Sequence, residues 1–93
     1  MLQNPNWTVE EAPARRGVVA HHAAPRFQAF WTTGREELAT IDGPCWTQEG
    51  SGDEDALHIF GFAWTDAAPS QSAFENLMRQ AAAVIEDWIT DRL

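Results

Sequence analysis

The chain has 93 residues, 44% of them hydrophobic and 22% charged, and a formal net charge of −8 at pH 7. This length fits one domain with a core of its own, and the composition excludes a wholly disordered chain. Apolar residues never run to the 18 or more positions that a membrane span requires, so we expect no membrane protein.

The charge is divided unevenly along the chain. Residues 1–35 carry four arginines and two acids, whereas residues 36–93 carry two arginines and twelve acids. An acidic surface repels phosphate backbones, because affinity for nucleic acid depends on cations that displace counterions. We therefore expect no nucleic-acid partner. An acidic face can instead meet a basic protein.

Residue usage is unusual in three respects. All six cations are arginine, tyrosine is absent, and there are five tryptophans. The first two are typical of GC-rich coding, which indicates a bacterial or phage protein. The tryptophans need a different explanation, because each carries a large area that must be buried or used in a contact. Cys45 is the single cysteine, which excludes an internal disulfide and favours a cytoplasmic location.

The N-terminal segment indicates an arm. We expect residues 1–14 to form an extended or frayed arm and residues 15–93 to form a single α+β domain. Thr8 and Glu11 have the spacing of a capping box, which predicts one short helical turn. Pro13 would end this turn almost at once.

Segments typical of strands follow, each rich in β-branched or aromatic residues and bounded by turn residues. They cover residues 18–22, 26–32, 37–41, 45–48 and 56–64. Asp42 and Gly43 give the strongest hairpin signal, because a type I′ turn needs positive φ at both central positions.

The last segment has the periodicity of an amphipathic helix. Its apolar stripe is about 140° wide, as expected for one buried face. The stripe contains Phe74, Leu77, Met78, Ala81, Val84, Ile85, Trp88, Ile89 and Arg92. Ser72 and Glu75 have the capping-box spacing, which predicts the start of the helix. The fold class is therefore α+β: an antiparallel β-meander of four or five strands with one long C-terminal amphipathic helix packed on one face.

No segment matches a metal or phosphate motif. The acidic loop 49–55 fails as an EF-hand, because oxygen ligands starting from Asp53 do not recur at the required positions. His21 and His22 are adjacent, so in a strand they point to opposite faces and cannot grip one metal ion. We expect no metal and no cofactor.

Cys45 is the one candidate nucleophile. It could react if His58 and an acid such as Asp42 lay beside it, since a thiolate needs a base and an orienting group. Nothing in the sequence brings them together, so we expect no enzyme. The alternative is a small-ligand-binding or minor catalytic protein, with a pocket lined by aromatics and His58 and with Cys45 or His21 as reactive groups.

The segment 56–64 carries the leading hypothesis. Alternation puts a small aliphatic set on one face, where the helix can approach closely. This set is Leu57, Ile59, Gly61 and Ala63. The other face holds His58, Phe60, Phe62 and Trp64.

One helix covers only one face of a sheet, and exposed apolar area is unfavourable by roughly 25 cal/mol per Å². Three alternatives remain: the arm with Trp7 folds over the aromatic face, the sheet curls on itself, or this face binds protein. The interface candidates are Phe60, Phe62, Trp64, His58 and Trp31. This hypothesis predicts a small acidic, non-enzymatic protein of bacterial or phage origin that acts by protein binding, in the first place as a homodimer and otherwise with a different protein.

Overall fold

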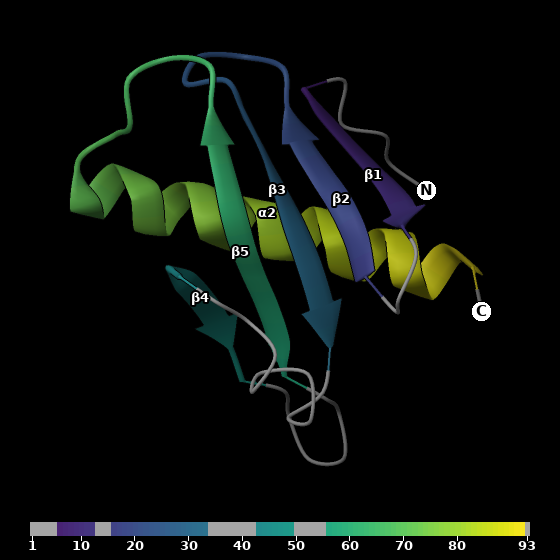
Figure 1. Ribbon diagram of the computed structural model, residues 1–93. Helices are drawn as coiled ribbons and strands as arrows, with labels where there is room; N and C mark the ends of the chain where they lie inside the picture. The colour runs from purple at the N-terminus through teal and green to yellow at the C-terminus, as the bar shows by residue number, and fades with distance from the viewer. Residues whose placement is uncertain (1–5, 13–15, 34–42, 50–55, 93) are drawn as a thin grey trace.

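The computed structural model describes residues 6–12, 16–33, 43–49 and 56–92 (Figure 1). The predicted strand 37–41, the predicted turn residue Asp42 and the acidic residues 50–55 lie outside these ranges. Five strands and one helix occur within the described residues. They are β1 (Trp7–Ala12), β2 (Arg16–His21), β3 (Phe27–Thr33), β4 (Cys45–Gln48), β5 (Leu57–Trp64) and α2 (Gln71–Arg92).

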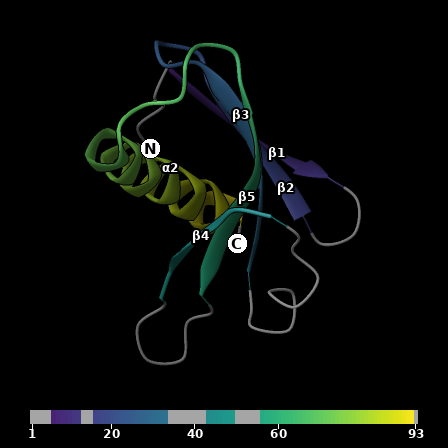
Figure 2. The same cartoon turned by 60° about the vertical axis from the view of Figure 1, so that its left-hand side comes forward.

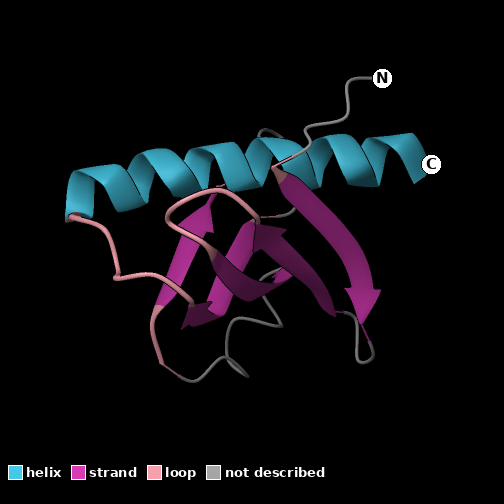
Figure 3. Ribbon diagram, turned by 90° about the horizontal axis from the view of Figure 1, so that it is seen from above, coloured by secondary structure: helices cyan, strands magenta, loops and turns pink. Residues whose placement is uncertain are grey.

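The strands form one antiparallel sheet with the order β1-β2-β3-β5-β4. The helix α2 packs on one face of this sheet and crosses its strands (Figures 2 and 3). The predicted α+β fold class is therefore confirmed. The order departs from a simple meander at one place, because β5 lies between β3 and β4 and leaves β4 at the edge.

The N-terminal segment contributes an edge strand. Along β1, Trp7 lies opposite His21 and Thr8 opposite Ala20. The predicted helical turn at Thr8 and Glu11 was wrong, because pairing with β2 outweighs the local capping signal. The Thr8 hydroxyl is hydrogen-bonded to His22 Nε2 at 2.8 Å instead. The indole of Trp7 is buried and lies 4.3 Å from the His21 ring.

The core lies between α2 and the face of the sheet that we call the inner face, which carries Val19, Phe27, Ala29, Trp31 and Ile59. The helix buries Leu77, Met78, Ala81, Ala82 and Ile85 against it. This confirms the predicted apolar stripe and adds Ala82. At the sheet edge, Gln48 donates to the Glu86 carboxylate at 2.7 Å and ties β4 to α2.

The helix begins two residues earlier than the predicted capping box implies. The Ser70 hydroxyl accepts a hydrogen bond from the Ala73 N–H at 3.4 Å, and the Ser70 carbonyl accepts one from the Phe74 N–H at 2.8 Å. Ser70 therefore occupies the N-cap position. The prediction of Ser72 as the cap was wrong, because Ser72 lies within the first turn.

A β-bulge at Gly61 interrupts β5. Phe30 pairs with Phe60, but Gln28 pairs with Ala63, so two residues of β5 stand opposite Ala29 alone. Gly61 has a φ of 64°. A bulge with a glycine in this left-handed conformation inserts one residue and shifts the alternation of side chains by one position.

This shift divides the predicted aromatic face. Before the bulge, Leu57 and Ile59 face the helix, as predicted. After it, Phe62 and Trp64 face the helix, where Gly61 and Ala63 had been predicted. The prediction that His58, Phe60, Phe62 and Trp64 share one face was wrong.

Trp31 also lies on the inner face. Its ring packs edge-on against Trp88 with centroids 5.5 Å apart. A methyl group on Gly17 would come within 2.1 Å of this ring, so the two residues fit together only with glycine at position 17. Packing alone places the indole, because its buried N–H has no acceptor within the described part of the chain.

Gly17→Ala should lower the free energy of unfolding by about 1–3 kcal/mol, since the added methyl group forces the Trp31 ring out of a packed core. Urea unfolding followed by circular dichroism measures the loss. In the double variant Gly17→Ala, Trp31→Leu the two losses should sum to more than the measured total, because they share one contact. Strict additivity would show that the close approach of Gly17 to Trp31 has no energetic weight.

Gly61→Ala should destabilise the protein more than Gly43→Ala. Both glycines have positive φ, 64° and 90°, and a left-handed backbone is unfavourable for alanine by about 1–2 kcal/mol. A methyl group at Gly61 would also come within 2.8 Å of the Phe30 ring, whereas Gly43 faces open space. Urea midpoints of the two variants give the comparison. Equal losses would mean that the Phe30 contact is relieved without cost.

Candidate functional site

Three of the five predicted interface residues are buried within the single chain. His58 is 1% exposed, Phe60 5% and Trp31 7%. His58 and Phe60 lie on the outer face, which is the face of the sheet away from α2 and also carries Phe30. The Phe30 ring lies 5.9 Å from Phe60, and the Arg16 guanidinium lies 5.0 Å from the same ring. The expectation of an uncovered aromatic face was therefore wrong here.

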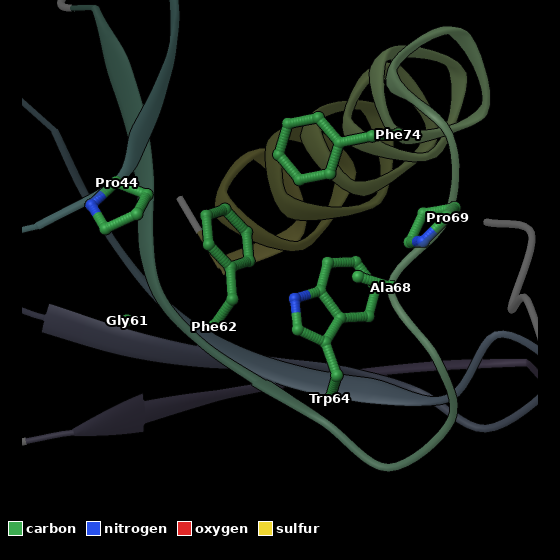
Figure 4. Close-up of a pocket in the computed structure, with 7 residues that line it drawn as sticks. All are labelled: Pro44, Gly61, Phe62, Trp64, Ala68, Pro69 and Phe74. Carbon is green, nitrogen blue, oxygen red and sulfur yellow. The ribbon is translucent and has the colours of Figure 1, made fainter.

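The remaining two candidates, Phe62 and Trp64, are half-buried and form the wall of an open hollow. We call it the aromatic hollow, and its volume is about 370 Å³. It is lined by Pro44, Gly61, Phe62, Trp64, Ala68, Pro69 and Phe74 (Figure 4). The lining comes from the end of β5, the loop that follows it, the first turn of α2 and the residue before β4.

Three rings set the shape of the hollow. Phe62 and Trp64 lie side by side, with centroids 6.0 Å apart and planes only 18° from parallel. Phe74 faces them from the helix, at 5.4 Å from Phe62 and 6.2 Å from Trp64 (Figure 4). Each side chain is held by its neighbours, so the surface is formed before any ligand arrives.

The hollow stays open because β4 is short. Its ladder with β5 begins at Cys45 opposite Phe60. One residue further, Pro44 would meet the bulge at Gly61, and proline has no N–H to donate. Within the described residues no strand therefore pairs with residues 61–64 on the β4 side.

Hydrogen bonds and an ion pair between Arg26 and Asp66 hold the end of β5. One carboxylate oxygen of Asp66 accepts hydrogen bonds from the Arg26 backbone N–H at 2.8 Å and from its Nε at 3.2 Å. The other accepts one from Nη2 at 3.0 Å. The Thr65 N–H donates to the Arg26 carbonyl at 2.9 Å. These bonds fix the backbone next to Trp64 and the point where the chain turns toward α2.

The hydrogen bonds from the Arg26 side chain, and then that from its backbone N–H, hold the pKa of Asp66 below its ordinary value. They favour the ionised carboxylate in the folded protein. Both side chains are partly exposed, at 56% for Arg26 and 29% for Asp66, so solvent weakens the pair.

The two histidines point to opposite faces, as predicted. His21 Nδ1–H donates to the Pro25 carbonyl at 2.9 Å on the inner face, and His22 contacts Thr8 on the outer face. Among the residues that the structure describes, no three His, Cys, Asp or Glu side chains converge as metal ligands would. No described helix is long and apolar enough to span a bilayer.

Cys45 lies exposed on the outer face of β4. Its Sγ is 3.8 Å from the Thr47 hydroxyl, which is hydrogen-bonded to His58 Nδ1 at 2.9 Å. His58 does not line the aromatic hollow. The alternative pocket of aromatics with His58 is therefore not this one, because the bulge separates the histidine from Phe62 and Trp64.

Sequence reasoning missed several lining residues. Phe74 was assigned to the core stripe, and Pro44, Ala68 and Pro69 drew no attention as site residues. The signals were the proline before β4, which predicts the end of a ladder, and the glycine within β5, which is typical of a bulge.

No family model, curated protein or solved structure matches this chain.

Asp66→Asn should reduce stability most at neutral pH. The folded-state pKa of Asp66 is depressed, so the stabilisation from its ionised form is fully present above the ordinary value of 3.8 and is lost as pH falls through the folded-state value. The difference in urea midpoint between wild type and variant should therefore be largest at neutral pH and should shrink as the pH is lowered below 3.8. Arg26→Gln should show the same convergence. Differences that stay constant would exclude the ionised pair as the cause.

Proposed function

We propose that this chain is a small acidic, non-enzymatic protein that acts by binding another protein through the aromatic hollow. The observation that carries the proposal is an accessible apolar wall, built by Phe62, Trp64 and Phe74 from two elements of the fold. Apolar and aromatic side chains grouped in a recess are typical of binding pockets.

The residue types support this role. Tryptophan is enriched among the residues that dominate binding energy, and such residues sit in preformed pockets. Rings already held by one another lose little conformational freedom on binding, which favours affinity. A volume of about 370 Å³ accommodates side chains of a partner or a small apolar ligand.

The charge supports a basic partner. With a net charge of −8, the chain attracts basic surfaces over long distances and repels acidic ones. A homodimer is the competing form of the proposal, with the aromatic hollow as its contact. We place the protein in the cytoplasm, since its single cysteine offers no internal disulfide.

Ala68→Glu should weaken partner binding at least tenfold or so, because it puts a charge into the apolar hollow without removing a ring from the core. Ala68 is exposed and lines the hollow. Ala67→Glu, at the exposed neighbouring position outside the lining, is the matched control and should bind normally. Both variants should unfold at the same temperature as wild type.

Binding can be followed, in cells of the source organism, with a photocrosslinking amino acid at position 71, which is exposed at the start of α2 and lies on the same face of the helix as Phe74. The cross-linked species should disappear in the Ala68→Glu background and persist in the Ala67→Glu background. Sedimentation of the purified protein shows whether that species is a dimer. Equal cross-linking in both backgrounds would refute the aromatic hollow as the contact.

A further inference from the structure

We propose that residues 62–64 of β5 accept an extended segment of a basic partner as an added strand. This rests on the proposed function and specifies how the partner is held. The partner's backbone would pair with the open edge of β5, and its alternate side chains would enter the aromatic hollow.

The hydrogen bonds between β5 and β3 fix the direction of the backbone groups at the end of β5. In an antiparallel ladder the N–H and C=O of one residue point to the same neighbouring strand, and successive residues alternate. The Thr65 N–H points to β3, where it meets the Arg26 carbonyl, and Ala63 pairs with Gln28 in the same ladder. The N–H and C=O of Trp64 therefore point away from β3, toward the side where β4 has ended.

The open edge of β5 is short. Beyond the bulge at Gly61, residues 62–64 span about 10 Å at 3.3 Å per residue, which suits an extended segment of about three residues. Pro44 lines one end of the hollow, and Ala68 and Pro69 lie along the loop at the other (Figure 4). The lining thus frames a short strand rather than a long one.

The side chains of an added strand would alternate between the two faces of the sheet. Residues directly opposite each other in an antiparallel pair project to the same face of the sheet. A partner residue opposite Trp64 would therefore project to the inner face, toward Phe62 and Phe74. Partner residues two positions apart would share this face, so the segment should be apolar at alternate positions.

Charge favours a basic partner over a second copy of the chain. A second copy would bring the same net charge of −8 to the contact, which disfavours self-association. Glu75 follows Phe74 directly after the first turn of α2, and the nearby Asp66 is already paired with Arg26. Arginine or lysine beside the apolar positions would complement this surface, and a cation can also lie over the Trp64 ring.

Selection of a displayed library of random eight-residue peptides tests the inference on the full-length chain. Wild type and Ala68→Glu are screened in parallel. We expect peptides enriched by wild type alone, with aliphatic residues at alternate positions and arginine or lysine at the flanks. The strongest peptide is then synthesised without modification and in two N-methylated forms, each methylated at one of two adjacent central residues.

Amide hydrogen exchange supplies the decisive readout. When the synthetic peptide binds, exchange at the Trp64 amide should slow at least tenfold or so, because an N–H that no described strand pairs with becomes hydrogen-bonded. The Ala63 amide already belongs to the ladder with β3 and serves as the internal control. Successive N–H groups of the peptide point to opposite sides, so only one of the two methylated positions faces β5. The peptide methylated there should lose most of its affinity, because the methyl group removes the N–H that donates to the ladder.

Different results would refute the proposed function and the added strand. If no peptide prefers wild type over Ala68→Glu, both the proposed function and the added strand are refuted. If a peptide binds in the hollow while the Trp64 amide exchanges as before, only the added strand is refuted. Acidic selected sequences would overturn the assigned charge of the partner. A dimer of the pure protein that Ala68→Glu dissociates would overturn the choice of partner in favour of a second copy.

Discussion

The left-handed backbone of Gly61 decides which aromatic side chains this protein buries and which it presents. Without the extra residue, Phe62 and Trp64 would lie on the outer face with Phe60, and the helix would pack over Gly61 and Ala63. With it, their rings turn toward α2 and meet Phe74 at 5.4 and 6.2 Å. One residue of low steric demand thereby builds the wall of the aromatic hollow.

The two faces of the sheet are covered by different means. On the inner face, α2 buries aliphatic side chains such as Ile59 and Met78 completely. On the outer face, Phe60 is covered in part by the Phe30 ring and the Arg16 guanidinium, and His58 bonds to Thr47. A sheet with one helix can therefore bury aromatic residues on both faces, which removes the reason to expect a large uncovered surface.

Sequence periodicity predicted what depends on a regular repeat. The stripe that includes Leu77 and Ile85 follows the helical period, so the helix and its buried face were predictable. The strand over Leu57–Trp64 was predictable as a strand, but its faces were not, because a bulge breaks the period of two at a single residue. Gly61 was taken as a small contact residue under the helix, although glycine within a strand also indicates a bulge.

The same two irregularities leave the aromatic hollow open at this edge of the sheet. Sheet edges are usually blocked by short strands, charges or proline, because an open edge can pair with other chains. Pro44 ends β4 as such a residue, but the segment of β5 beyond it carries apolar rings and no charge. The block therefore protects the ladder up to Phe60 and exposes the next residues above a preformed apolar wall. The edge that we propose as the acceptor of an added strand therefore combines two features: backbone groups that no described strand pairs with, and a wall of aromatic rings beside them.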